Sequence, residues 1–411
     1  MSNTIRLQNI LEKAVNNVPF YKGMHPKGTA LSLNDFPIVD KSAMINNRLG
    51  FISEIYHEAY QSIIDENGDC DLIVEYTSGS SGYPLLCVKS KKEATKYALS
   101  LLRKRKHIYR NYTLDNMFCF IHNRDYESNG YQNGLGNLNN SNILKVLIYL
   151  RDEVKPTVLH GNPMLLIYYA KYIHEFGFDL KKWSIEFIES VSESISESDK
   201  ALVEKSFNTK LINCYGCLEC YNLAYECEKG QLHINENVIA EVVSVDNANQ
   251  AMAAGETGEI LITSLVNEIQ PIIRYKTSDI GFISNSCDCG NKQPVISLSG
   301  TRKIDYINLL LGQKDAQDVT ICGYDIFSAA MNNLVKQGKD YVKWYNVIQH
   351  NYTDFEVLYV ANEGFSPSFF TEYELAVSSE IGYPIKLSYK LKTIEDAIYR
   401  NKKERVFKSI M

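Results

Sequence analysis

Apolar residues recur along the middle of this chain with two alternating periods, one typical of buried strands and one typical of amphipathic helices. Short apolar runs at residues 185–192 (IEFIESVS) and 209–216 (TKLINCYG) predict strands, and residues 197–207 between them have the period of a helix. Residues 154–177 repeat this order, with a Gly-Asn-Pro turn between strand and helix and Gly177 placed to end the helix. This alternation predicts α/β layers around a largely parallel sheet.

The preceding part of the chain has a mostly helical pattern. Residues 1–110 are predicted to be helical except around the apolar run at 70–76 (CDLIVEY) and a hydroxyl-rich loop that follows it. After that loop, residues 85–110 predict a strand that leads into a long basic helix.

Beyond residue 231 the helical period gives way to short strands separated by turn residues. Four strand-rich stretches, at 231–245, 258–265, 269–284 and 294–307, predict a small antiparallel sheet or barrel. We therefore expect a β subdomain at about residues 228–300.

The last part of the chain predicts a separate small unit. Residues 341–361 read as a hairpin, 369–382 as a helix and 385–394 as a strand. The predicted fold class is α/β, with a large N-terminal domain of layered α/β sheets at 1–303 and a small mobile α+β lid domain at 304–411.

Composition narrows the class of protein. The 411 residues are 45% hydrophobic and 22% charged, which is ordinary for a globular chain. The net charge of −6 argues against a protein that coats nucleic acid. No apolar run reaches the roughly 20 residues that a membrane helix needs, and the N-terminus lacks the apolar centre of a signal peptide, so we expect a cytoplasmic protein without membrane or nucleic-acid partners.

The loop at residues 76–84 (YTSGSSGYP) is built almost entirely from small and hydroxyl-bearing residues. Such a loop lets backbone amides and hydroxyl groups approach phosphate oxygens closely. It is not a Walker loop, because Gly-Lys-Ser/Thr is missing. Taken alone, the composition is compatible with a phosphate loop or with an ordinary turn.

Five segments in a fixed order resemble motifs of the adenylate-forming superfamily, which includes acyl-CoA synthetases, adenylation domains and luciferases. YTSGSSGYP resembles the phosphate loop of the superfamily, and NCYGCLE (213–219) resembles its Tyr-Gly-x-x-Glu motif. IIRYKTSDIG (272–281), SGTRKID (299–305) and NKKERV (401–406) resemble its Tyr-Arg/Lys-Thr-x-Asp motif, its hinge and its C-terminal lysine segment. Within the superfamily, the phenylacetate–CoA ligase branch and its capsular-polysaccharide-type relatives are most similar.

The resemblance implies an ATP-dependent, AMP-forming ligase. Such an enzyme joins a carboxylic acid, with aryl acids among the candidates, to AMP with Mg²⁺ present, and then passes the acyl group to CoA. An alternative keeps the adenylation but transfers to an amine, an amino sugar or a carrier protein. A more distant alternative is a catalytically impaired nucleotide-binding homologue, since fold resemblance does not identify an acceptor.

The resemblance also assigns roles to individual residues. Glu219 would hold Mg²⁺, Asp279 would accept hydrogen bonds from the ribose, and Arg302 would lie near the ribose and phosphates. Lys402, with Lys403 as the alternative, would stabilise charge on the α-phosphate. The nucleotide-binding residues would be Thr77, Ser78, Gly79, Ser80, Ser81 and Gly82 for the phosphates, and Ser192, Glu193, Tyr215 and Gly216 for the adenine.

The residues alone are also compatible with ordinary structural roles for three of these assignments. They are a solvated glutamate at a strand end for Glu219, a surface turn for Ser192 and Glu193, and a charged tail for Lys402.

Several positions depart from the motifs of the superfamily. Leu85 stands where a lysine often follows the loop proline, and Ser278 stands where many members have glycine. In the hinge, Thr301 replaces a glycine and Ile304 replaces the first aspartate, and Asn401 replaces the glycine before the lysine. The hinge changes put the usual domain rotation in doubt.

Two groups of cysteines have spacings that suggest metal ligands. Cys214, Cys217 and Cys220 match part of an iron–sulfur pattern, but the fourth cysteine does not follow at the required spacing. The favoured interpretation is a structural zinc site, because three thiolates and one imidazole complete a tetrahedral set of ligands. The alternative is that these cysteines are free and buried. The predicted site consists of Cys227, His233, Cys287 and Cys289, and similar segments occur in phenylacetate–CoA-ligase-like proteins.

The basic stretch at residues 89–110 is the remaining signal. It would either bind the phosphates of CoA or of a carrier's phosphopantetheine, or form a solvated helix face.

Overall fold

The computed structural model of the chain divides into two compact units, which are Met1–Thr277 with Gly281–Leu298, and Ser278–Ile280 with Ser299–Met411. Along the chain the first unit thus ends at Leu298, whereas the sequence predicted a boundary at residue 303. The residues that the structure describes are 2–24, 31–64, 71–77, 85–120, 140–191, 195–285, 287–302, 306–307, 321–339, 341–351, 354–362, 364–381, 385–393 and 407–409.

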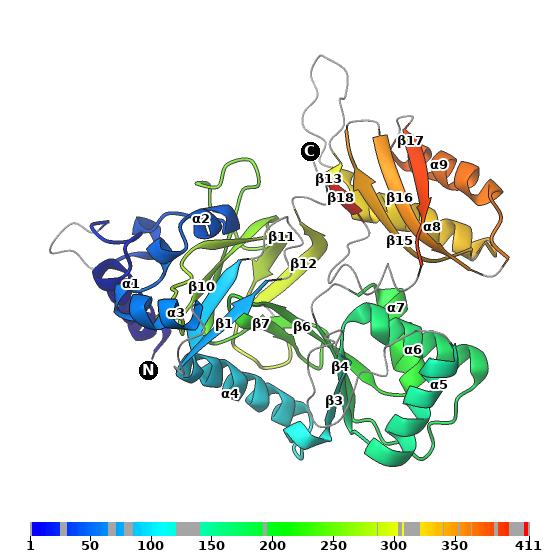
Figure 1. Cartoon of the computed structure of the whole chain (residues 1–411), viewed down its shortest axis with the longest axis horizontal. Helices are drawn as coiled ribbons and strands as arrows, with labels where there is room; N and C mark the ends of the chain where they lie inside the picture. The colour runs from blue at the N-terminus through cyan, green and yellow to red at the C-terminus, as the bar shows by residue number, and fades with distance from the viewer. Residues whose placement is uncertain are drawn as a thin grey trace. The chain divides into compact units, whose positions relative to one another are not determined.

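A ten-stranded sheet runs through the first unit (Figure 1). Its first four strands are parallel neighbours: β3 (Met117–Phe120), β4 (Val158–Gly161), β5 (Phe187–Val191) and β6 (Lys210–Cys217). The other six follow in the spatial order β7 (Tyr221–Glu226), β8 (Leu232–Ile234), β12 (Val295–Arg302), β11 (Tyr275–Ser284), β10 (Gly258–Ser264) and β9 (Val238–Val243).

The antiparallel strands continue the parallel ones. Strand β7 pairs antiparallel with β6, and β8 pairs antiparallel with β7 and with β12. The strands predicted beyond residue 231 therefore extend the central sheet, where the sequence pattern had suggested a sheet or barrel of their own.

The helices begin and end at residues whose chemistry marks helix termini. At the start of α6 (Pro163–Phe176), Asn162 Oδ1 accepts a hydrogen bond from the backbone amide of Leu165 at 2.9 Å. Gly177 ends this helix with a left-handed backbone at φ 64°. The capping box that begins α4 (Lys91–Ile108) joins Ser90 and Glu93. The other helices along these strands are α5 (Asn140–Tyr149) and α7 (Glu197–Phe207).

The N-terminal segment adds the helices α1 (Asn3–Asn17), α2 (Lys41–Asn46) and α3 (His57–Ile64) and the hairpin of β1 (Leu72–Tyr76) and β2 (Leu86–Ser90). Leu11 and Tyr21 from this segment share one apolar core with Ile260 and Tyr275 of the large sheet. This burial, worth roughly 25 cal/mol per Å² of apolar surface, fixes the N-terminal segment against the sheet.

The second unit has its own sheet and core. The sheet order is β17 (Lys386–Leu391), β16 (Asp354–Ala361), β15 (Val342–Gln349) and β18 (Phe407–Ser409), and the helices are α8 (Gly323–Lys336) and α9 (Ser368–Ile381). A short pair, β13 (Tyr306–Ile307) and β14 (Ile321–Cys322), completes it. The predicted hairpin, helix and strand are present, whereas α8 and β18 were not predicted.

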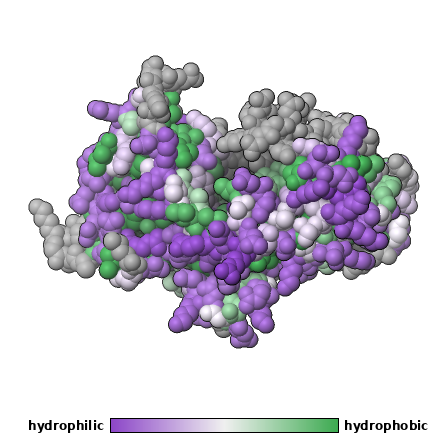
Figure 2. All heavy atoms as spheres, turned by 90° about the horizontal axis from the view of Figure 1, so that it is seen from below, coloured by the Kyte–Doolittle hydropathy of each residue, from purple (hydrophilic) through white to green (hydrophobic). Residues whose placement is uncertain are grey.

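The outer surface is largely polar where Figure 2 shows it, with apolar residues in small groups. Within the described part of the chain, none of the helices combines the length and apolar character that a bilayer crossing requires.

Candidate functional site

The β1–β2 hairpin holds the two ends of the small-residue loop together. The amide of Thr77 donates to the carbonyl oxygen of Leu85 at 2.9 Å, and the amide of Leu85 donates to Thr77 Oγ1 at 2.8 Å. The Thr77 hydroxyl thus accepts a hydrogen bond at the base of the loop. Five of the predicted phosphate-binding residues lie outside the described residues, namely Ser78, Gly79, Ser80, Ser81 and Gly82.

Glu219 lies at the tip of the hairpin formed by β6 and β7 and is only 6% exposed. The hydroxyl of Tyr275 donates to Glu219 Oε1 at 2.7 Å, and Asn267 Nδ2 donates to the backbone carbonyl of Glu219 at 3.0 Å. Burial and the negative charge of Glu219 raise the pKa of Tyr275, which keeps this hydroxyl a donor at neutral pH. The carboxylate of Glu219 has four acceptor positions. Among the described side chains, Tyr275 supplies the one hydrogen bond to it.

The glycine of the Tyr215-Gly216 pair is required by the backbone. A Cβ atom at Gly216 would lie 2.1 Å from the carbonyl oxygen of Tyr221, and the strand register shifts between Tyr215 and Gly216. Tyr221 itself is in the left-handed region at φ 53°, which is rare for an aromatic residue. The glycine therefore allows the hairpin tip to close, and its place in an adenine pocket stays a prediction.

Strand β11 carries Asp279 directly after Ser278, whose φ is 64°. Glycine adopts this left-handed conformation without steric cost, so the serine at this position is strained. Arg302 is the last residue of β12. Three other predicted site residues, Ser192, Glu193 and Lys402, lie outside the described part of the chain.

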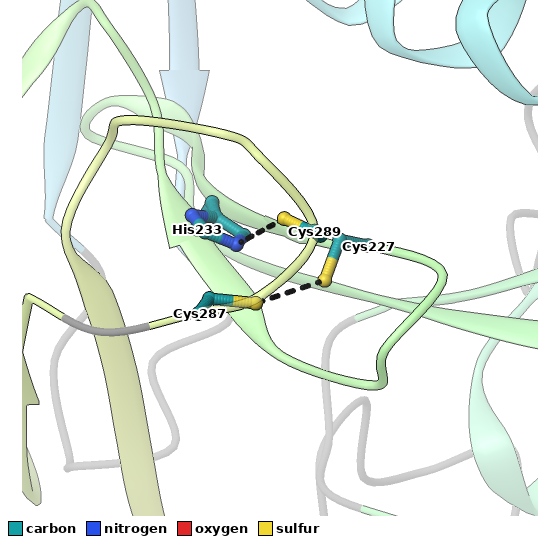
Figure 3. A group of neighbouring side chains, drawn as sticks. All are labelled: Cys227, His233, Cys287 and Cys289. Carbon is teal, nitrogen blue, oxygen red and sulfur yellow. Dashed lines mark hydrogen bonds between the residues drawn. The ribbon is translucent and has the colours of Figure 1, made fainter.

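The four predicted zinc ligands lie together (Figure 3). One donor atom from each of them falls within 4.8 Å of the others. Cys227 Sγ is 3.8 Å from Cys287 Sγ, and Cys289 Sγ is 3.1 Å from His233 Nε2. Two turns supply the cysteines, and Gly230 and Gly290 in these turns have φ 73° and 82°.

The orientation of His233 is fixed by its other ring nitrogen. Nδ1 lies 2.7 Å from the carbonyl oxygen of Gln293, and a carbonyl can only accept, so Nδ1 carries the proton. The lone pair of Nε2 is then directed toward the sulfur atoms, as in many protein zinc sites. The Asn291 amide also donates to Cys289 Sγ at 3.4 Å.

The cysteines of the iron–sulfur pattern are placed differently. Cys220 is fully buried in the apolar core, and Asn222 Nδ2 donates to Cys214 Sγ at 2.8 Å. In the described regions, Cys214, Cys217 and Cys220 do not form a group of three candidate metal ligands.

A buried ionic network that the sequence analysis missed lies between α4 and the parallel strands. Glu189 of β5 is 0% exposed and accepts bonds from Arg105 Nε at 2.9 Å, Arg105 Nη2 at 2.5 Å, Tyr225 Oη at 2.7 Å and His160 Nδ1 at 2.7 Å. Burial alone would raise the pKa of Glu189, but the hydrogen bonds from Arg105 and His160 outweigh it and hold the pKa well below its usual value. Arg105 Nη1 also donates to Tyr112 Oη at 3.0 Å.

Burial of two of its cations revises the interpretation of the basic stretch. Arg105 and Lys89 are buried, so neither belongs to a phosphate-binding surface. Several of the other cations form ion pairs, for example Arg103 with Glu236 at 3.0 Å and Lys96 with Glu268 at 3.8 Å.

Comparison with known proteins agrees with the resemblance in the sequence, although no family model matches the chain. The phenylacetate–coenzyme A ligase of Thermus thermophilus is 26% identical over 149 residues, which are 35% of this chain and 33% of that protein. The phenylacetate–coenzyme A ligase of Aromatoleum evansii is 22% identical over 138 residues, which are 32% of this chain and 31% of that protein. The chain thus matches about a third of the length of these curated relatives.

The fold has a match among solved structures. A 2-hydroxyisobutyryl-CoA ligase in the postadenylation state has a TM-score of 0.67 and 15% identity, and the match covers 99% of this chain and 88% of that chain. The predicted fold class and the resemblance to the adenylate-forming superfamily are confirmed at the level of fold, with a local sequence match to phenylacetate–coenzyme A ligases.

Proposed function

We propose that the protein is an AMP-forming ligase that activates a carboxylic acid with ATP and transfers the acyl group to coenzyme A. In the first step, a carboxylate oxygen attacks the α-phosphorus and the bond to pyrophosphate breaks. In the second step, the thiol sulfur attacks the acyl carbon, AMP leaves, and the thiol proton passes to solvent. The fold, the local match to two coenzyme A ligases and the ordered motifs support this proposal.

The observation that carries the proposal is the buried carboxylate of Glu219. Its hairpin tip lies against the β1–β2 hairpin, which closes the base of the small-residue loop through Thr77 and Leu85. A carboxylate that accepts one hydrogen bond from the described side chains fits Mg²⁺, which binds one or two carboxylates together with phosphate oxygens. Bound Mg²⁺ would neutralise phosphate charge, and Tyr275 would hold the carboxylate in place.

The remaining roles carry over from the motifs as part of this proposal. The loop at 78–82 would contact the phosphates, and Ser192 and Glu193 the adenine. Asp279 would bind the ribose, with Arg302 nearby, and Lys402 would stabilise charge on the α-phosphate during adenylation.

The cluster of Cys227, His233, Cys287 and Cys289 fits a structural zinc ion. Three sulfurs and one imidazole nitrogen fill a tetrahedral site, and no ligand position is left for a substrate. The metal would join the turn after β7 to the turn before β12, in a region of short strands. Its role in the proposal is to hold this part of the sheet together.

The test is ATP–pyrophosphate exchange by the purified protein with Mg²⁺ and a panel of carboxylic acids. A separate assay without added pyrophosphate uses hydroxylamine to trap acyl-adenylate. Glu219→Gln should reduce exchange about 100-fold, the scale of losing one electrostatic stabiliser. The control Glu197→Gln changes an exposed glutamate of α7 and should have no effect.

Two outcomes of this assay are informative. Near-normal exchange in Glu219→Gln would refute the magnesium assignment. Addition of coenzyme A or of amines to the active mixture identifies the acceptor, and amide formation without thioester formation would replace coenzyme A in the proposal.

A further inference from the structure

Lys89 is a charged residue in an unusual place. Its side chain on β2 is 1% exposed, and lysines are rarely buried to this degree unless they are paired. Nζ donates to the carbonyl oxygen of Leu218 at 2.7 Å, lies 3.7 Å from Glu75 Oε2 and lies 4.4 Å from the centre of the Tyr221 ring. A carbonyl, a carboxylate and an aromatic face thus compensate for the loss of water.

Strand alternation explains why Lys89 points in this direction. Residues of one face of the β1–β2 hairpin, including Leu86 and Val88, pack into an apolar cluster with Ile269. Lys89 and Glu75 lie on the opposite face. That second face packs against the tip of the β6–β7 hairpin.

Tyr221 connects the same two hairpins. Its hydroxyl donates to Glu75 Oε2 at 2.5 Å, while its ring lies under the ammonium group of Lys89. Burial, with the hydrogen bond to Glu75, raises the pKa of Tyr221, so the phenol stays protonated. A left-handed backbone at a tyrosine is strained, and such strain persists only where surrounding contacts hold it.

These contacts converge on the residues that flank Glu219. Lys89 holds the carbonyl of Leu218 directly before Glu219, and Asn267 holds the carbonyl of Glu219 itself. The partners of Lys89 lie in β1 and in the hairpin tip, so its ammonium group is used within the protein.

Resting on the proposed function, we propose that Lys89 is a positioning residue for Glu219. By fixing the β6–β7 tip to the β1–β2 hairpin, it holds the carboxylate of Glu219 in one place for the metal. Outer contacts of this kind affect metal affinity because they orient the ligand.

The first test measures the hairpin tip directly, without relying on activity. Lys89→Met keeps the length of the side chain and removes the ammonium group. Amide hydrogen exchange of residues 217–221 should become faster in this variant, while exchange in the second unit stays unchanged. The control Lys92→Met removes an exposed lysine of α4 and should leave exchange at 217–221 as in the wild type.

The second test measures the Mg²⁺ dependence of pyrophosphate exchange. Lys89→Met should raise the Mg²⁺ concentration for half-maximal exchange about 10- to 100-fold, the range for losing an outer-shell contact. In a Glu219→Gln background, Lys89→Met should cause little further change, because both substitutions act on one site. A general loss of stability would instead reduce activity without changing the Mg²⁺ requirement.

The outcomes separate this inference from the proposed function. Unchanged hydrogen exchange at 217–221, or an unchanged Mg²⁺ requirement in an active variant, overturns the role of Lys89. Absence of pyrophosphate exchange in the wild type refutes the proposed function, and amide hydrogen exchange then decides alone whether Lys89 holds the tip.

If Lys89→Met does not fold, Tyr221→Phe serves instead, because it removes only the hydrogen bond to Glu75. Tyr221→Phe should accelerate amide hydrogen exchange at the same residues, and no acceleration overturns the inference.

Discussion

Replacement of Arg105 by methionine should destabilise the protein strongly. The change removes three hydrogen bonds, two to Glu189 and one to Tyr112. It leaves a fully buried carboxylate with Tyr225 and His160 as its remaining partners. Breaking a buried ion pair from one side costs about 3–5 kcal/mol, because the other charge stays buried without compensation.

Urea unfolding followed by circular dichroism measures this loss, and Arg103→Met is the matched control on the same helix. Arg103 pairs with Glu236 at the surface, where its side chain is 71% exposed, so its removal should cost at most about 1 kcal/mol. The double variant Arg105→Met with Glu189→Leu should recover much of the lost stability, because no charge is then left buried. A loss below about 1 kcal/mol in Arg105→Met would show that the Glu189 network is not sealed from water.

The same network predicts a dependence on pH. The folded-state pKa of Glu189 lies below its unfolded value, taken as 4.5, so the ionised carboxylate stabilises the fold above that pH. This stabilisation is lost as the pH falls through the folded-state pKa. Glu189→Gln should therefore make the decline in Tm below about pH 4.5 shallower, and an unchanged slope in thermal unfolding would contradict the assignment.

Three further predictions concern other parts of the chain. Metal analysis should find about one zinc per chain in protein purified without chelator, and none in Cys287→Ser/Cys289→Ser; iron, or no metal in the wild type, would contradict the zinc assignment. Ser278→Gly should raise the free energy of unfolding by about 0.5–1 kcal/mol, since glycine relieves the left-handed strain but gains entropy when unfolded. Lys402→Ala should slow acyl-adenylate formation while preserving thioester formation from supplied acyl-adenylate, and Lys403→Ala should do little; equal effects on both half-reactions would refute the role of Lys402.

Features set by short stretches of sequence were predictable. The turn at Asn162 and the glycine that ends α6 depend on neighbouring residues, and the structure has them as expected. The metal-ligand cluster was predictable for a similar reason. Cys227 with His233 and Cys287 with Cys289 are pairs of residues close together in the sequence. Only the approach of one pair to the other depends on the fold.

Features that depend on distant contacts were not predictable. Glu189 meets Arg105 across 84 positions and His160 across 29, and each of the three residues resembles an ordinary surface group in its own segment. Lys89 was grouped with the basic stretch because its charge was visible in the sequence and its burial was not. The extension of the parallel sheet by antiparallel strands was missed because strand pairing leaves little local trace.

The pairing of β8 with β12 has a consequence for the order in which the chain folds. Val295 pairs with His233, and Cys227 and Cys287 at the base of this closure are 60 residues apart. Closing a loop of that length costs roughly 4 kcal/mol in chain entropy before the strands gain any pairing energy. A metal ion that binds the two cysteine turns early would lower this barrier, so refolding with zinc should be faster than refolding with a chelator. The metal would then act as a folding nucleus. Its supply during synthesis would determine how long β8 and β12 remain unpaired and exposed to aggregation.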